Sequence, residues 1–203
     1  MKTNKPFLVG ITGGIGSGKS TACRIFSILG VPIYYADHRA KWLMANDEEL
    51  KAGIISNFGT ESYSPDGSLN RTYLASVVFA DENKTAVINN LVHPAVKKDF
   101  ENWVSDQKTA YVLKEAALLF ETGSYQDLDK IINVSAPLKT RITRVLMRDR
   151  HRSEQQVNEI IDKQLSDEEK NQKADYVIKN NENKLLIPQV LEIHKKLLAA
   201  VPA

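Results

Sequence analysis

Short apolar runs alternate with segments of helical periodicity along this chain of 203 residues. The first run, Phe7–Thr12, leads directly into a stretch of glycines, which is typical of a buried strand followed by a loop. From Lys19, apolar residues recur every three or four positions until Gly30, as in an amphipathic helix. A second apolar run covers residues 31–36 and ends at Asp37. This order of strand, loop, helix and strand predicts the βαβ unit of a parallel sheet.

The remaining pattern predicts three more strands and several helices. Residues 38–107 have helical periodicity with breaks at 57–59 and 64–67, and they are too long for a simple crossover connection, so we expect a helical insertion there. The further strands are predicted at 111–113, 130–134 and 176–178, and the further helices at 138–150, 153–163 and 186–198. Ser153, with Gln156 three residues later, predicts a capping box.

The loop after the first strand matches G-x-x-x-x-G-K-[ST], the phosphate-binding motif known as the P-loop. Its residues are Gly13, Gly14, Ile15, Gly16, Ser17, Gly18, Lys19 and Ser20. Glycines let the backbone approach phosphate oxygens, and consecutive N–H groups at the start of a helix form an anion-binding nest. The match lies between a predicted strand and a predicted helix, as the motif requires. We therefore expect an α/β P-loop NTPase fold with three layers, in which a five-stranded parallel sheet carries helices on both faces.

This loop also supplies candidate ligands for ATP and Mg²⁺. Lys19 would bridge the β- and γ-phosphates, the Ser20 hydroxyl would ligate Mg²⁺, and Thr21 would contact the α-phosphate. The candidate cofactor-binding residues of the loop are Gly14, Ile15, Gly16, Ser17, Gly18, Lys19, Ser20 and Thr21. A GTPase of this class would need an N-K-x-D segment to read guanine, and Asn83-Lys84-Thr85-Ala86 lacks the final Asp. A guanine switch protein is therefore disfavoured.

Asp37 follows the second predicted strand, at the sheet edge where ligands bind in open α/β folds. A carboxylate there can accept the proton of an attacking hydroxyl and orient it toward the γ-phosphate. The alternative role is an N-cap for a helix that begins near His38. The phosphate loop favours the catalytic role, although the two roles can coexist.

Charge is concentrated in one segment. The formal net charge of +2 does not indicate a nucleic-acid or membrane partner, yet residues 139–152 hold six Lys or Arg and a single Asp. Arg141, Arg144 and Arg148 stand at i, i+3 and i+7, so they share one helix face. A charge run is usually a solvated face, but few acids accompany these arginines, and arginine suits bidentate phosphate contacts. We predict a lid over ATP with Arg144 and Arg148 as catalytic residues and Arg141 as a nucleotide contact.

The composition of the chain indicates its cellular compartment and excludes some classes of binding partner. Cys23 is the only cysteine, so no internal disulfide is possible, and no apolar run reaches the roughly 20 residues of a membrane helix. No cluster of His, Cys and Glu has the spacing of a structural zinc site. We expect a cytoplasmic protein without a membrane or nucleic-acid partner, and a monomer, with an oligomer left open.

Along almost its whole length the chain resembles the dephospho-coenzyme A kinase family. The extended phosphate loop of residues 10–20, the pair Ala36-Asp37 and the arginines of the predicted lid match motifs of that family. The other matching stretches are Leu69-Asn70-Arg71 with Leu74 and Val78-Phe79, His93-Pro94, Leu118-Leu119-Phe120-Glu121, and Gln164 with Ala174-Asp175, Val177-Ile178 and Asn180-Asn181.

The resemblance implies transfer of a phosphoryl group from ATP to the ribose 3′-hydroxyl of dephospho-CoA, which gives coenzyme A and ADP. It implies one kinase unit, 1–203, composed of a nucleotide core of residues 6–37, 108–137 and 174–203, a substrate-binding lobe of residues 38–107 and a lid of residues 138–173. Carried over by position, Asp37 becomes the general base. The candidate substrate-binding residues are Asn70, Arg71, His93, Leu118, Leu119 and Phe120.

Two features weigh against parts of this assignment. By composition alone, residues 118–120 would be plain core, and a lone histidine such as His93 is more often packed than ligating. Where the family usually has Asp and Pro just before the Leu-Leu stretch, this chain has Glu115 and Ala117. The detailed shape of the acceptor wall is therefore expected to differ from the family pattern.

The residues alone leave two other functions open. Another small-molecule kinase, for a nucleoside or a shikimate-like acceptor, would use the same loop and lid. A nucleotide-binding switch or scaffold without kinase chemistry would need the loop but not Asp37. Phosphotransfer to a panel of acceptors separates these functions.

Overall fold

The computed structural model describes residues 5–79, 81–181 and 183–201. The chain divides into two compact units, one formed by Met1–Tyr35 with Gln107–Ala203 and the other by Ala36–Asp106. We call them the sheet unit and the helical unit and describe each by itself. Because the helical unit begins at Ala36, Asp37 is part of it.

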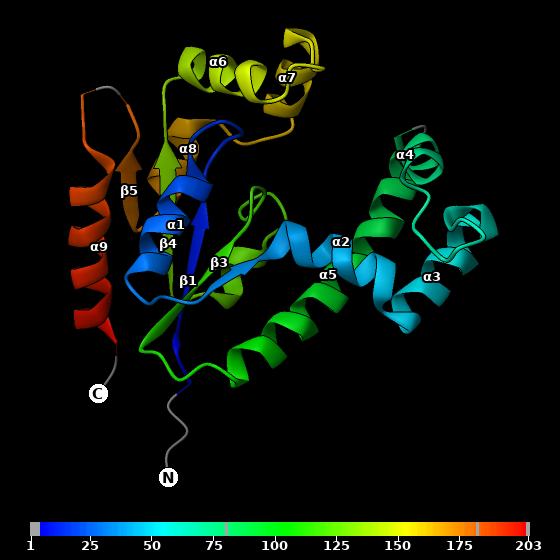
Figure 1. Cartoon of the computed structure of the whole chain (residues 1–203), viewed down its shortest axis with the longest axis horizontal. Helices are drawn as coiled ribbons and strands as arrows, with labels where there is room; N and C mark the ends of the chain where they lie inside the picture. Colours follow the sequence, from blue (N-terminus) through cyan, green and yellow to red (C-terminus); the bar gives the residue numbers. More distant parts are fainter. Residues whose placement is uncertain (1–4, 80, 182, 202–203) are drawn as a thin grey trace. The chain divides into compact units, whose positions relative to one another are not determined.

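The sheet unit contains a five-stranded parallel sheet (Figure 1). Its strands are β1 (Phe7–Thr12), β2 (Ile33–Tyr35), β3 (Tyr111–Glu115), β4 (Lys130–Ser135) and β5 (Tyr176–Lys179). They are arranged in the order β2-β3-β1-β4-β5, which places β1 at the centre. All four pairings are parallel, so the carboxyl ends of the strands lie along one edge of the sheet. The predicted fold class is confirmed.

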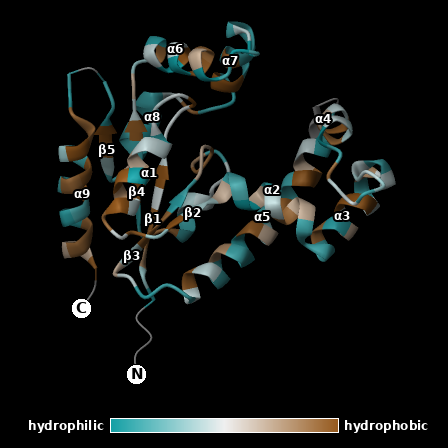
Figure 2. Cartoon of the chain, in the orientation of Figure 1, coloured by the Kyte–Doolittle hydropathy of each residue, from teal (hydrophilic) through white to brown (hydrophobic). Residues whose placement is uncertain are grey.

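The apolar strands form the core of this unit because both faces of the central strands are covered. Val9 and Ile11 of β1 and Ile132 of β4 are fully buried. Figure 2 shows the hydrophobic colour along these strands and on one side of the covering helices. Burial on both faces accounts for the continuous apolar runs in the sequence, since a half-exposed strand would alternate apolar and polar residues.

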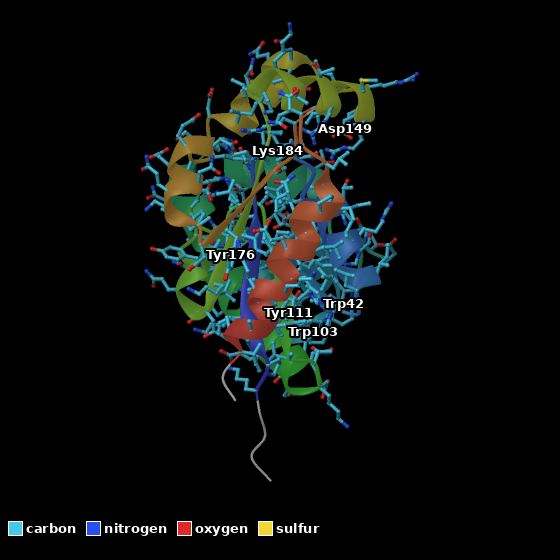
Figure 3. All side chains as sticks on the ribbon, turned by 90° about the vertical axis from the view of Figure 1, so that its left-hand side faces the viewer. Trp42, Trp103, Tyr111, Asp149, Tyr176 and Lys184 are labelled. Atoms are coloured by element: carbon cyan, nitrogen blue, oxygen red, sulfur yellow. The ribbon has the colours of Figure 1, made fainter. Side chains whose placement is uncertain are left out.

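Among the described residues of the sheet unit, six helical segments accompany the strands. They are α1 (Lys19–Ile28), η2 (Ser124–Asp127), α6 (Leu138–Arg148), α7 (Glu154–Ile161), α8 (Asp167–Lys173) and α9 (Leu186–Ala200). α1 and α9 pack side by side, with Phe26 and Leu197 in one core cluster. The Tyr111 hydroxyl lies 2.6 Å from Nδ1 of His194, which ties α9 to β3 (Figure 3). α8 packs against β4, while α6 and α7 pack together beyond the carboxyl ends of the strands (Figure 1).

The capping box predicted at Ser153 is confirmed. The Ser153 hydroxyl accepts from the Gln156 N–H at 3.2 Å, and Gln156 Oε1 accepts from the Ser153 N–H at 3.0 Å. A second capping box, which we did not predict, joins Ser166 and Glu169 at the start of α8. These caps satisfy N–H groups that the first turn of a helix leaves unpaired.

The helical unit consists of α2 (Ala36–Asn46), α3 (Glu48–Phe58), η1 (Thr60–Ser62), α4 (Arg71–Phe79) and α5 (Glu82–Ser105). α5 packs against α2, α3 and α4. Both predicted breaks are present, because α3 ends at Phe58 and no helix covers residues 63–70. No helix in the described part of the chain combines the length and the apolar character that crossing a bilayer requires.

Two details differ from the sequence predictions. β2 has only three residues, because Val31 and Pro32 precede it, although the Pro32 carbonyl still accepts from Leu113 N–H at 2.9 Å. The alternative role of Asp37, as an N-cap, is wrong. α2 begins at Ala36, so Asp37 lies in its first turn.

Candidate active site

The predicted phosphate loop connects β1 to α1 at the carboxyl edge of the sheet. Lys19 Nζ donates to the carbonyl oxygen of Gly13 at 2.7 Å, so its side chain folds back along the loop. Gly16 has a φ of 78°, and a Cβ there would lie 2.4 Å from the carbonyl oxygen of Arg141 in α6. Only glycine combines this backbone angle with such a close approach of a second backbone.

Three side chains from distant parts of the sheet unit hold the loop in place. Arg141 Nε donates to the Ile15 carbonyl oxygen at 3.0 Å, and Gln164 Oε1 accepts from the Ile15 N–H at 2.9 Å. Asn180 Nδ2 donates to the Ser17 carbonyl oxygen at 2.7 Å. The loop geometry therefore depends on α6, on the connection between α7 and α8, and on the residue after β5.

The first turn of α1 presents the predicted metal and α-phosphate ligands. Ser20 and Thr21 are both exposed, and α1 has no acidic residue in its first turn. Unpaired N–H groups and the positive end of the helix dipole therefore face solvent without a competing carboxylate. Within the described residues, no three His, Cys, Asp or Glu side chains are grouped as a metal site. A hydroxyl with nucleotide phosphates and waters is the donor set that Mg²⁺ commonly uses, and Ser20 fits it.

Arg141 is buried, with only 5% of its surface exposed. A Cβ on Gly14 would lie 2.1 Å from one of its guanidinium nitrogens, which shows how closely the side chain covers the loop. Asp167 Oδ1 lies 3.9 Å from Arg141 Nη1, and the other carboxylate oxygen of Asp167 accepts from the Ser135 hydroxyl. Burial lowers the pKa of Arg141, while Asp167 and Glu168 act to raise it. The guanidinium is thus a desolvated cation that an anionic ligand would stabilise.

Arg144 and Arg148 lie in different surroundings. Arg144 Nη2 donates to the Asn180 carbonyl oxygen at 3.4 Å, and its Nη1 lies 4.0 Å from the place of a Cβ on Gly18. Arg148 instead makes two hydrogen bonds to Asp149, at 2.9 and 3.0 Å, which raise the pKa of Arg148. Asp149 follows the end of α6 (Figure 3). The one acid of the basic segment 139–152 is therefore paired with Arg148, whereas Arg141 lies near the more distant Asp167.

Asp37 is exposed, two residues after the end of β2 in the chain. The carboxyl end of β2 lies at the same sheet edge as the phosphate loop, as the βαβ prediction required. His38, its neighbour, is also exposed.

Glu115 is a candidate that the sequence interpretation treated only as a departure from a family pattern. It ends β3, between Ile11 of β1 and Tyr35 of β2 in the register, and its exposure is 8%. Burial first, and then the nearby Glu115 carboxylate, raise the pKa of Cys23 to about 12. An acidic residue at the end of a strand that begins with an apolar run was the signal in the sequence. A carboxylate on the strand next to the phosphate loop is suited to Mg²⁺.

The Leu118–Phe120 stretch is mostly core. Leu119 and Phe120 are buried, and Phe120 packs against Tyr125 with ring centroids 5.3 Å apart. Leu118 alone is exposed, at 40%. The next residue, Glu121, accepts from Leu165 N–H at 2.8 Å and lies 2.8 Å from Nζ of the fully buried Lys170.

The predicted substrate residues of the helical unit are spread over two helices. Asn70 Oδ1 accepts from the Tyr73 N–H at 3.2 Å at the start of α4, and Asn70 Nδ2 donates to the Glu61 carbonyl oxygen at 3.0 Å. Arg71, the first residue of α4, is exposed. His93 is exposed in α5, beside Pro94. Asn70 therefore has a structural role in this unit.

A cavity of about 450 Å³ lies beside the phosphate loop within the sheet unit. Arg141 and Gln164, which hold Ile15, also line this cavity, together with Ser135, Asp167 and Asn181. Its walls come from the end of β4, the start of α6, the α7–α8 connection and the end of β5. Arg141 and Gln164 therefore connect this cavity to the loop.

Comparison with known proteins identifies similar sequences over most of the chain. The family model described as "Dephospho-CoA kinase" matches residues 7–185. A dephospho-CoA kinase of Bacteroides fragilis (strain YCH46) is 39% identical over 186 residues, which cover 91% of this chain and 90% of that relative.

Solved structures are similar at full length. A crystal structure of a Thermus thermophilus protein has a TM-score of 0.81 and 30% sequence identity, covering 98% of this chain and 99% of its own. The structure of a dephospho-CoA kinase from Campylobacter jejuni has a TM-score of 0.69 and 26% identity, covering 95% of this chain and 97% of its own. The sheet and its accompanying helices are therefore shared with proteins of known fold.

Proposed function

The chain belongs to the dephospho-CoA kinase family, and from this membership we propose how its own residues carry the reaction. The enzyme uses ATP to phosphorylate dephospho-CoA, the last step of coenzyme A biosynthesis. The acceptor atom is the ribose 3′-hydroxyl oxygen. The observation that carries the assignment is the glycine loop between β1 and α1, with Lys19 folded along it, in a chain that matches this family from residue 7 to residue 185.

The phosphate loop binds the donor. The N–H groups of residues 14–21, other than that of Ile15, which Gln164 holds, form with the start of α1 the nest for the β- and γ-phosphates, and Thr21 contacts the α-phosphate. Lys19 exchanges the Gly13 carbonyl for phosphate oxygens. Ser20 and Glu115 are the residues that would hold Mg²⁺, which would neutralise charge on the phosphates.

The arginines of α6 act on the transferring group. Arg141, already buried against the loop, contacts the nucleotide phosphates. Arg144 and Arg148 stabilise charge on the equatorial oxygens of the γ-phosphoryl group, and Arg148 exchanges Asp149 for phosphate as it does so. Residues 138–173 form the lid that excludes water during transfer.

Asp37 is the general base, and the helical unit supplies the acceptor-binding lobe. Asp37 accepts the proton of the 3′-hydroxyl while the oxygen attacks phosphorus and the bond to the ADP leaving group breaks. Arg71 and His93 are the candidate contacts to the acceptor in this unit, and Asn70, the residue before Arg71, supports the start of α4. In the sheet unit, exposed Leu118 is the apolar contact, with Leu119 and Phe120 behind it. The protein acts in the cytoplasm as a monomer.

An acceptor panel tests the assignment. Purified protein with ATP and Mg²⁺ is given dephospho-CoA, adenosine or shikimate, and both ADP and the phosphorylated acceptor are measured. We expect the highest kcat/KM for dephospho-CoA. Faster phosphorylation of adenosine or shikimate would contradict the acceptor assignment, and ATP hydrolysis without phosphorylation of any acceptor would contradict kinase chemistry.

Asp37→Asn tests the base. We expect kcat to fall by about 10²- to 10⁴-fold, while the Kd for ATP stays within about threefold, because the base acts on the acceptor proton. Glu101→Gln is the matched control, an exposed carboxylate on α5 of the same unit. Near-normal turnover of Asp37→Asn would remove Asp37 from the mechanism.

A further inference from the structure

Both backbone groups of Ile15 are held by side chains that are remote in sequence. Its N–H donates to Gln164 Oε1 at 2.9 Å, and its carbonyl accepts from Arg141 Nε at 3.0 Å. The partners lie 149 and 126 residues away along the chain. Ile15 is the third residue of the loop, where neither a strand nor a helix supplies hydrogen bonds. The peptide groups on either side of Ile15 are therefore oriented by tertiary contacts.

Gln164 reaches the loop from an anchored segment. It lies three residues beyond the end of α7, and its own N–H donates to the Ile161 carbonyl oxygen at 2.9 Å. The N–H of the next residue, Leu165, donates to Glu121 Oε1 at 2.8 Å. The same Glu121 oxygen lies 2.8 Å from Nζ of Lys170, whose side chain is fully buried. The Gln164 amide is thus presented from a fixed backbone.

The chemistry of an amide suits this place. A neutral carbonyl oxygen can hold an N–H group of the loop without adding negative charge beside the phosphates, which a carboxylate would repel. A glycine-rich loop loses much conformational freedom when it is ordered, so contacts that order it before the ligand arrives strengthen binding. We propose that Gln164 is a positioning residue, which holds the phosphate loop in its anion-binding shape through the Ile15 N–H. This inference rests on the proposed ATP-binding role of the loop.

A second possible role of Gln164 predicts the opposite change in the Kd for ATP. If the Gln164 oxygen stood in for a phosphate oxygen, ATP would have to displace it, and removal of the amide would tighten ATP binding. If Gln164 positions the loop, removal weakens binding. The direction of the change in Kd therefore separates the two roles.

Gln164→Met removes the acceptor and keeps a side chain of similar length. We expect the Kd for ATP, measured by titration calorimetry, to rise about tenfold or more, because a half-buried N–H loses its partner and the loop must be ordered by the ligand. With saturating ATP, kcat should fall by less than about threefold, since Gln164 does not touch the reacting atoms. Gln155→Met is the control, because the exposed Gln155 amide donates to the Glu159 side chain at 3.2 Å and makes no bond to the loop among the described residues.

Hydrogen exchange of the Ile15 N–H without nucleotide reports the contact itself. We expect this amide to be protected in the wild type and in Gln164→Glu, whose carboxylate retains an acceptor, and to exchange faster in Gln164→Met. Gln164→Glu should also weaken ATP binding, by repulsion, and more so at low salt. This variant provides the test if Gln164→Met does not fold.

Three results overturn the proposal: an unchanged Kd in Gln164→Met, a lower Kd, or Ile15 exchange that does not differ between the Met and Glu variants. A higher Kd with faster Ile15 exchange and an unaffected control supports it. The Kd comparison needs no acceptor. A wild-type protein that binds ATP but does not phosphorylate dephospho-CoA would therefore defeat the proposed function and leave this inference standing.

Discussion

Asn180 donates a hydrogen bond from Nδ2 to the carbonyl oxygen of Ser17 at 2.7 Å, although 163 residues separate them. The same amide nitrogen lies 2.1 Å from the place that a Cβ on Gly18 would occupy. Together with Arg141 and Gln164 at Ile15, this contact surrounds the phosphate loop with side chains from three segments. The absence of a Cβ at the glycines of the motif therefore lets side chains of the protein pack against the loop, as well as letting a ligand approach it.

Gly16→Ala should disable the loop more severely than its backbone strain alone predicts. An alanine at positive φ costs roughly 1–2 kcal/mol wherever it stands. At Gly16 the new Cβ would also meet the Arg141 carbonyl oxygen at 2.4 Å, so the loop or α6 must move, and a displacement of about 1 Å can lower the rate about 10²-fold. The measurement is kcat/KM for ATP.

Gly30→Ala is the matched control for this change. Gly30 also has a positive φ, of 83°, but nothing lies within 4 Å of its added Cβ. We expect a similar loss of stability from strain and near-normal catalysis. Equal kinetic losses in Gly16→Ala and Gly30→Ala would contradict the importance of close packing between loop and α6.

The two outer arginines of α6 should differ in effect. Arg144 lies beside Gly18 and Asn180, so Arg144→Met should lower kcat by about 10²- to 10³-fold, the loss typical of a removed charge-stabilising donor. Arg148 must first leave Asp149, and its side chain is 64% exposed. We therefore expect the fall in kcat in Arg148→Met to be roughly tenfold smaller than in Arg144→Met. Saturating steady-state kinetics with both substrates measures the difference. A larger loss in Arg148→Met would mean that the lid rearranges more than the described contacts suggest.

Lys170→Met should destabilise the sheet unit strongly. Lys170 is fully buried and pairs with Glu121, so its removal leaves a half-buried carboxylate without its cation. Breaking such a pair typically costs about 3–5 kcal/mol of unfolding free energy. Urea denaturation measures this, with Lys173→Met as the exposed control on the same helix.

A double variant separates the charge from the packing. In Lys170→Met with Glu121→Gln neither charge of the pair remains, so part of the lost stability should return. A double variant as unstable as the sum of the two single variants would show that packing around Lys170, and not the ion pair, carries the effect.

The strand pattern and the phosphate motif were predictable from sequence because both are local. β1 is a buried apolar run, and the spacing from Gly13 to Ser20 is carried by eight successive residues. The limits of β2 were less predictable, since Pro32 continues the pairing through its carbonyl while lying outside the strand. The local sequence pattern thus predicted the order of the strands and helices better than the residues at which they end.

The contacts around the loop could not be predicted in this way. Arg141, Arg144 and Arg148 share one helix face, as their spacing indicates, yet Arg141 is buried and Arg148 is exposed. Helical periodicity gives a direction around the helix axis but not the distance to the next layer. Gln164 carried no local signal for its bond to Ile15, whereas Asp149, adjacent to Arg148, could have been recognised as its partner.

The stability of the protein should fall in alkali through Cys23. Burial raises the pKa of this thiol to about 12, whereas an unfolded thiol titrates near about 8.5. Between about pH 9 and pH 11 the folded state keeps the proton that the unfolded state has lost, so the folded state binds more protons and the unfolding free energy decreases as pH rises. One such group contributes a slope of up to about 1.4 kcal/mol per pH unit. Urea denaturation from pH 8 to pH 11 should therefore show a steeper decline for the wild type than for Cys23→Ala, and parallel curves would mean that the thiol titrates normally in the folded protein.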